Sequence, residues 1–95
     1  MNKYEIMFIL KSSEEETIKN EISSLKSIIT DMKGEITDEK DMGNRKLAYQ
    51  INKEVNGYYY VINCNATREI VEEFNRKARS SEFVIRHMII KLDKE

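Results

Sequence analysis

The chain has 95 residues, 40% hydrophobic and 35% charged, so it can bury one core and is too short for two. We predict a single domain over residues 1–95. The formal net charge is only -1, but residues 14–41 carry nine acids and four bases whereas residues 42–95 carry ten bases and seven acids. A polyanion would meet the second segment rather than the first.

The sequence also indicates where in the cell the protein is found. It contains no run of 18 apolar residues and no signal-peptide pattern at its start, which argues against membrane insertion and secretion. Cys64 is the only cysteine, so no disulfide can form within the chain, and its strand context predicts a buried thiol. We expect a cytoplasmic protein.

The first half of the chain reads as a strand followed by a helix. Residues 3–10 alternate with a period of two and are apolar on both sides, which predicts a strand inside a sheet. Ser13 and Glu16 have capping-box spacing, and the apolar residues from Ile18 to Met32 recur every three or four positions. We predict one helix that Gly34 ends as a left-handed cap.

The second half repeats the pattern with other residues. A strand region covers about 35–52, with a bulge or bend expected near Asp41 to Gly43. Asn56-Gly57 indicates a turn before a third strand at 58–65. Thr67 is the expected N-cap of a shorter helix, and Val84 to Leu92 forms the last strand.

The order βαββαβ predicts an α+β, ferredoxin-like fold, with a four-stranded antiparallel sheet and two helices on one face. The opposite sheet face would then lack a helical cover. The predicted core consists of these residues: Ile6, Phe8, Leu10, Ile18, Ile22, Leu25, Ile29, Ile62, Cys64 and Phe74.

Catalytic chemistry is hard to assemble from this sequence. His87 is the only histidine, and it has no cysteine, aspartate or second histidine at metal-ligand spacing. Glu14 to Glu16 sit in the expected first helical turn, where negative charge suits the helix dipole. We therefore predict no enzyme activity, no metal site and no cofactor.

The sequence offers more candidate residues for RNA binding than for catalysis. Arg45 and Lys46 follow the flexible Gly43-Asn44 pair and can reach phosphates, although a solvated edge strand would carry such charges too. Arg86 and Lys91 add cations on the last strand, and Lys3 joins them if the first strand lies alongside.

Asn56 to Val61 partly imitates the pattern of RNA-recognition motifs, but Asn56 is not basic and Tyr59 replaces a small residue. By alternation Tyr58 and Tyr60 belong to the core, and Tyr59 and Val61 face outward.

These residues resemble the bacterial small-subunit (30S) ribosomal protein family conventionally numbered six. The resemblance covers almost the whole chain and is carried by Tyr4-Glu5-Ile6-Met7-Phe8-Ile9-Leu10, Gly43-x-Arg45-Lys46-Leu47-Ala48-Tyr49-x-Ile51, Gly57-Tyr58-Tyr59 and Arg86 to Lys91. It implies binding to the central domain of small-subunit ribosomal RNA (rRNA), as a heterodimer with the small-subunit protein numbered eighteen.

Two sets of site residues follow as expectations for a ribosome-associated protein. The rRNA-binding set is Lys3, Arg45, Lys46, Arg86 and Lys91. The partner-protein set is Met7, Ile9, Tyr59, Val61, Met88 and Ile90.

Two rival hypotheses remain open from the sequence. One is a stand-alone single-stranded RNA binder of the RNA-recognition-motif type, which requires solvent-facing Tyr58 and Tyr60. The other is a small ferredoxin-like enzyme or ligand-binding domain, which a convergent polar pocket would support.

Overall fold

The computed structural model describes residues 1–51 and 54–92, with the side chains at 48–51 and 54–55 left out. Part of the predicted Gly43 to Asn52 motif therefore lies outside the described residues. The elements are β1 (Asn2–Lys11), α1 (Glu15–Asp31), β2 (Glu35–Ile51), β3 (Glu54–Ala66), α2 (Arg68–Ser80) and β4 (Val84–Lys91).

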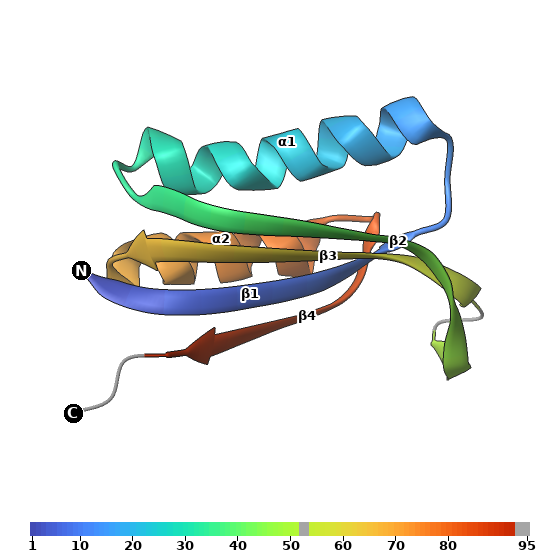
Figure 1. Cartoon of the computed structure of the whole chain (residues 1–95). Helices are drawn as coiled ribbons and strands as arrows, with labels where there is room; N and C mark the ends of the chain where they lie inside the picture. Colours follow the sequence, from blue (N-terminus) through green and yellow to red (C-terminus); the bar gives the residue numbers. More distant parts are fainter. Residues whose placement is uncertain (52–53, 93–95) are drawn as a thin grey trace.

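The strands form one sheet in the order β2-β3-β1-β4, with every neighbouring pair antiparallel. Both helices lie on the same side of this sheet (Figure 1). The predicted ferredoxin-like α+β fold is confirmed, and β1 lies inside the sheet as its two-sided apolar pattern indicated. None of the described helices is long and apolar enough to cross a membrane.

The core lies between the sheet and the helices. All ten predicted core residues are buried there, and Phe8, Phe74, Ile29 and Ile62 have no exposed surface. The Phe8 ring packs at centroid distances of 5.7 Å from Tyr60 and 6.1 Å from Phe74. Cys64 is buried as predicted, and burial raises the pKa of its thiol.

The ends of α1 differ from the prediction. The N-cap is Glu14, with no side-chain cap hydrogen bond, so Ser13 and Glu16 do not form the expected capping box. After the helix, the left-handed residue is Lys33 (φ 71°) and not Gly34. Gly34 is needed for another reason: a Cβ there would lie 2.8 Å from the Ile29 side chain and 3.1 Å from the Asn65 carbonyl.

The β2–β3 pairing also corrects one expectation. The predicted bulge is confirmed, because the register shifts between Asp41 and Gly43, and Gly43 has φ 78°. The predicted Asn56-Gly57 turn is wrong, because both residues lie within β3, opposite Lys46 and Arg45. The two strands thus form a longer ribbon, which extends past the helical layer (Figure 1).

α2 begins at the N-cap residue that the sequence predicts. The Thr67 side chain accepts a hydrogen bond from the Ile70 amide at 3.2 Å, as an N-cap residue does. Lys77 and Arg79 occupy the last turn, where cations suit the helix dipole.

Candidate nucleic-acid and partner interface

The sheet face without helices, here called the open face, is built from the odd-numbered positions of β1 and β3 and the residues paired with them. Residues directly opposite each other on antiparallel strands share a face. One row across the four strands consists of Met88, Met7, Val61 and Lys40; the next consists of Arg86, Ile9, Tyr59 and Gly43.

The open face presents large apolar side chains. Met88 is 48% exposed and Ile90 is 45% exposed, while Met7, Tyr59 and Val61 are partly exposed. We call these five residues the apolar patch. Grouped apolar side chains on a protein surface mark an interaction site.

Ile9 belongs to the open face but is only 5% exposed. It packs over Gly57, where an added Cβ would lie 2.4 Å from Ile9 Cγ2 and 3.4 Å from Leu47 Cδ2. Leu47 is buried as well. Ile9 therefore supports the patch and offers almost no surface of its own to a partner.

The two cations of the predicted motif point in different directions. Arg45 lies opposite Gly57 and Lys46 opposite Asn56, and both are exposed. Because successive strand residues alternate between faces, Arg45 is on the side of the open face and Lys46 on the other side of the ribbon. The Arg45 Nε donates to the Met42 carbonyl at 3.0 Å, beside the bulge.

The other predicted cations do not all gather in one place. Lys3 lies opposite Asn65, beyond one end of the apolar patch. Arg86 lies opposite Ile9, in the same row as Tyr59, roughly 20 Å from Lys3 along β1. Lys91 lies opposite Tyr4, a core residue, and therefore belongs to the helix-covered side of β4. The structure does not bring Lys91 together with Arg86.

The open face carries two further cations that the sequence did not predict as site residues. Lys11 lies opposite Gly57 beyond Ile9, and Lys40 lies opposite Val61. The alternation of β1 would have placed Lys11 on this face. Lys40 could not be placed, because β2 also shifts register after Ile36, where the sequence has no signal that fixes the phase of the strand.

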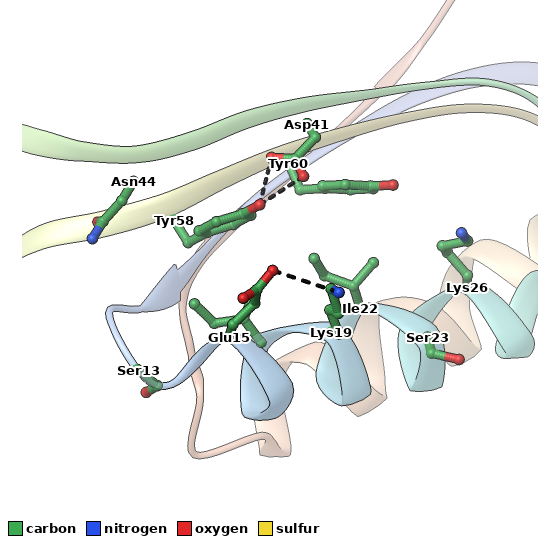
Figure 2. A pocket seen from close by; sticks show the side chains of 11 residues that line it. Ser13, Glu15, Lys19, Ile22, Ser23, Lys26, Asp41, Asn44, Tyr58 and Tyr60 are labelled. Atoms are coloured by element: carbon green, nitrogen blue, oxygen red, sulfur yellow. Dashed lines mark hydrogen bonds and ion pairs between the residues drawn. The ribbon is translucent and has the colours of Figure 1, made fainter.

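Tyr58 and Tyr60 lie on the opposite side of the sheet, toward α1 (Figure 2). Tyr60 is 8% exposed, and its hydroxyl donates to Glu39. The Tyr58 hydroxyl lies 2.6 Å from both carboxylate oxygens of Asp41, and this bond is the main cause that raises the pKa of Tyr58 to about 12. These tyrosines are therefore not the stacking platform that the RNA-recognition-motif hypothesis required.

His87 also faces the helices. It lies opposite Phe8, and its Nε2 is 2.6 Å from the Asn75 Oδ1. Burial lowers the pKa of His87, and the charge of Arg79 adds to this effect. This placement makes His87 a packed side chain between β4 and α2.

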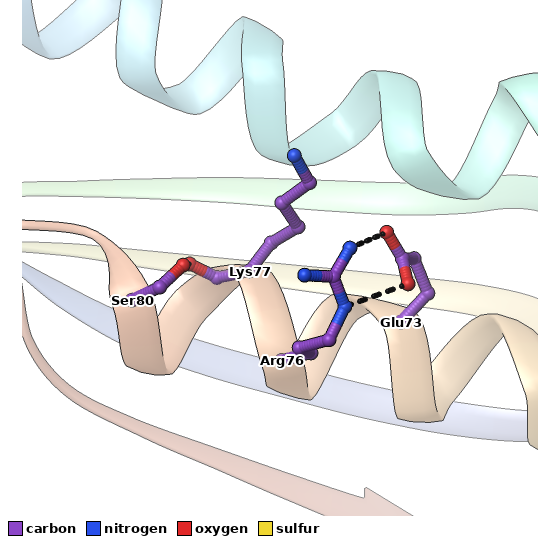
Figure 3. Close-up of polar contacts among 4 residues, drawn as sticks. All are labelled: Glu73, Arg76, Lys77 and Ser80. Carbon is purple, nitrogen blue, oxygen red and sulfur yellow. Dashed lines mark hydrogen bonds and ion pairs between the residues drawn. The ribbon is translucent and has the colours of Figure 1, made fainter.

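Two of the four cations of α2 form ion pairs on the helix itself. Arg76 donates two hydrogen bonds to Glu73, at 3.1 and 2.7 Å, and Arg68 pairs with Glu72 at 3.4 Å. Lys77 extends toward α1 (Figure 3). Within residues 1–51 and 54–92, no three potential ligands gather to hold a metal ion.

Comparison with known proteins agrees with this architecture. The family model of ribosomal protein S6 matches residues 3–91. The chain is 43% identical to small ribosomal subunit protein bS6 of Alkaliphilus oremlandii and 42% identical to that of Clostridium acetobutylicum; each match covers 99% of this chain and 100% of the relative.

A solved structure matches equally well in shape. The crystal structure of 30S ribosomal protein S6 from Thermotoga maritima superposes with a TM-score of 0.90 at 32% identity, over 96% of this chain and 87% of that one. The chain belongs to the ribosomal protein S6 family of the small ribosomal subunit.

Proposed function

We propose that this ribosomal protein binds the central domain of small-subunit rRNA together with the small-subunit ribosomal protein numbered eighteen, as an architectural component of cytoplasmic ribosomes. The observation that supports the proposal best is the apolar patch on the open face, with cations beyond both of its ends. A lone soluble protein gains nothing from exposing Met88 and Ile90, whereas a protein partner would bury them.

The two ligands use different parts of the same face. The apolar patch takes the protein partner, because removing apolar surface from water is favourable and needs no charge. Lys3, Arg45 and Arg86, with Lys11 beside Arg45, lie outside the patch and neutralise phosphates, which fixes the orientation on RNA. Lys46 and Lys91 lie on the other side of the sheet, so they contact only RNA that continues around a sheet edge.

A protein partner also accounts for RNA binding by a chain with almost no net charge. A chain with net charge -1 has little general attraction for a polyanion. When two weak binders are joined, the second contact becomes intramolecular and the complex gains affinity through effective concentration. Recognition then rests on shape and phosphate positions rather than on base reading.

The rival hypotheses have less support. A stacking platform needs exposed rings, and Tyr58 and Tyr60 are turned under α1 and bonded to carboxylates. A catalytic pocket needs a poised acid or base, yet the pKa values of both tyrosines are raised, for Tyr60 chiefly by burial. A hollow does lie beneath α1, and both polar and apolar side chains line it.

The phosphate contacts can be tested with the double variant Arg45→Ala and Lys46→Ala. Both side chains are exposed, so folding should hardly change. Binding of the heterodimer to a central-domain rRNA fragment should weaken, and the slope of log affinity against log salt should flatten by about one unit per lost contact.

The matched control is Arg68→Ala with Lys77→Ala, which removes the same charge from exposed positions on α2. It should leave the salt slope closer to that of the native protein. Equal affinity and equal slope for the Arg45 and Lys46 variant would rule out these residues as phosphate contacts.

A further inference from the structure

A hollow of about 470 Å³ lies between the N-terminal half of α1 and the β2–β3 pair, away from the open face. Figure 2 shows the rings of Tyr58 and Tyr60 on the sheet side, with Glu15, Lys19 and Ile22 across from them on α1. Ile18 and Ile22 supply apolar wall. None of these side chains belongs to the proposed rRNA and partner surfaces.

The hydrogen bonds leave Asp41, one of the two carboxylates in the lining, with spare acceptor capacity. Both tyrosine hydroxyls are used, one on Asp41 and one on Glu39. Asp41 also accepts from the Gly43 amide at 3.0 Å, but a carboxylate can accept about four hydrogen bonds. Within the described residues, no cation lies within ion-pair distance of Asp41.

The two lysines at the rim of the hollow already form ion pairs with carboxylates. Lys26 pairs with Glu39 at 2.9 Å, and Lys19 pairs with Glu15 at 3.5 Å. The lining itself is balanced in charge, with Glu15 and Asp41 against Lys19 and Lys26. The hollow therefore combines an aromatic floor, apolar walls and a carboxylate with spare acceptor capacity.

We propose that this hollow receives an arginine side chain from a basic segment of a partner protein. A guanidinium is planar and stacks on a tyrosine ring, and its fork of donors suits the Asp41 carboxylate. Its aliphatic stem would lie along Ile18 and Ile22. A lysine brings only a strongly hydrated point charge and fits this lining less well. The inference does not depend on the rRNA contacts.

The test uses the full chain and a blocked synthetic peptide with one central arginine between glycine and leucine residues. Titration followed by heteronuclear NMR should shift the signals of Tyr58, Tyr60 and Gly43. The same peptide with lysine should bind at least about threefold more weakly, and with glutamine at least about tenfold more weakly, because the charge and the planar fork are lost.

Variants then locate the site. Asp41→Asn keeps an acceptor for Tyr58 but loses the charge, and should weaken arginine-peptide binding at least about tenfold, the effect expected for losing a charge-assisted bond. Asp38→Asn, on the same strand but opposite Asn63 on the open face, is the matched control and should not change it. Lys19→Gln removes a rim cation and should tighten binding.

The inference is overturned if the arginine and glutamine peptides bind equally, or if Asp41→Asn and Asp38→Asn behave alike. Should Asp41→Asn fail to fold, the Lys19→Gln variant decides, because Lys19 is exposed and pairs with the exposed Glu15. Unchanged or weaker binding in that variant would also overturn the proposal. Loss of rRNA binding in the Arg45 and Lys46 variant would leave this result untouched.

Discussion

Gly57 shows how a single missing side chain shapes this molecule. Its sequence neighbour Asn56 gives it the appearance of a turn residue, yet it lies inside β3 without a positive φ. The absence of a Cβ lets Ile9 and Leu47 close over the strand. The same residue that indicated a hairpin turn thus serves close packing on the open face.

The Gly57→Ala substitution should destabilise the protein by about 1 to 3 kcal/mol, since the new Cβ would overlap Ile9 Cγ2. In urea unfolding, a double-mutant cycle with Ile9→Ala should show coupling of about 0.5 to 3 kcal/mol, because removing the methyl relieves the overlap.

Gly43→Ala is the matched control for this cycle. Its cost, about 1 to 2 kcal/mol, comes from the left-handed backbone at φ 78°, and nothing lies within 4 Å of the added Cβ. Ile9→Ala should therefore not relieve it. If Ile9→Ala relieves neither cost, contact of the new Cβ with Ile9 does not explain the Gly57→Ala cost.

Glu39 gives a prediction for pH dependence. The Tyr60 hydroxyl bond, and then Lys26, hold the pKa of Glu39 below its usual value of 4.5. A carboxyl whose pKa is lowered on folding contributes stability that is present above its unfolded pKa and is lost as the pH falls through the folded pKa.

The difference in unfolding free energy between native protein and Glu39→Gln should therefore be constant near neutral pH and shrink as the pH falls below 4.5. Urea titrations across this range measure it. In a Tyr60→Phe background, which lacks the main cause of the shift, the pH dependence should be weaker. A difference that grows in acid would contradict the assignment.

At the scale of the elements, the two helices begin in different ways. α2 has a hydrogen-bonded N-cap at Thr67, whereas α1 starts after Glu14 without a side-chain cap. What fixes α1 is its buried stripe of Ile18, Ile22, Leu25 and Ile29 against the sheet. Packing of an apolar face contributes more to helix stability in proteins than terminal signals do.

Thr67→Ala should accordingly cost about 1 kcal/mol, because it leaves the Ile70 amide without its acceptor. Ser13→Ala, at the position where the sequence pattern placed the other cap, should change stability by less than about 0.5 kcal/mol. Thermal or urea unfolding compares the two. Equal losses would mean that Ser13 caps α1 in solution.

At the scale of the whole molecule, the two helices on one side leave the other sheet face uncovered (Figure 1). Lys3 and Arg45 lie toward the two ends of this face, and the apolar patch lies between them. The hollow under α1 lies on the helical side. The fold thus separates the face proposed for rRNA and a protein partner from the hollow proposed for an arginine side chain.

Val61→Glu should abolish formation of the proposed heterodimer, since an unpaired carboxylate in an apolar interface costs several kcal/mol. The stability of the isolated chain should change by less than about 1 kcal/mol, because Val61 is partly exposed.

Asn20→Glu, at an exposed position on α1, is the control for added charge. Co-purification and calorimetry with the partner protein measure both variants. Native-like affinity in Val61→Glu would place the partner elsewhere.

The sequence by itself determined the order of the elements, the core, the Thr67 cap and the bulge near Gly43, because periodicity and capping are local properties of a chain. It also identified the family, and it gave the outward phase of Met7, Tyr59 and Val61 through the alternation of β1 and β3.

Only the tertiary structure decided features that depend on register. It separated Lys91 from Arg86, turned Arg45 and Lys46 to opposite sides, placed His87 toward the helices and buried Ile9 beneath the patch. It also brought Asp41 to Tyr58 across 17 positions of sequence. A shift of one residue in strand pairing reverses every face, and no local pattern in β2 indicated the shift after Ile36.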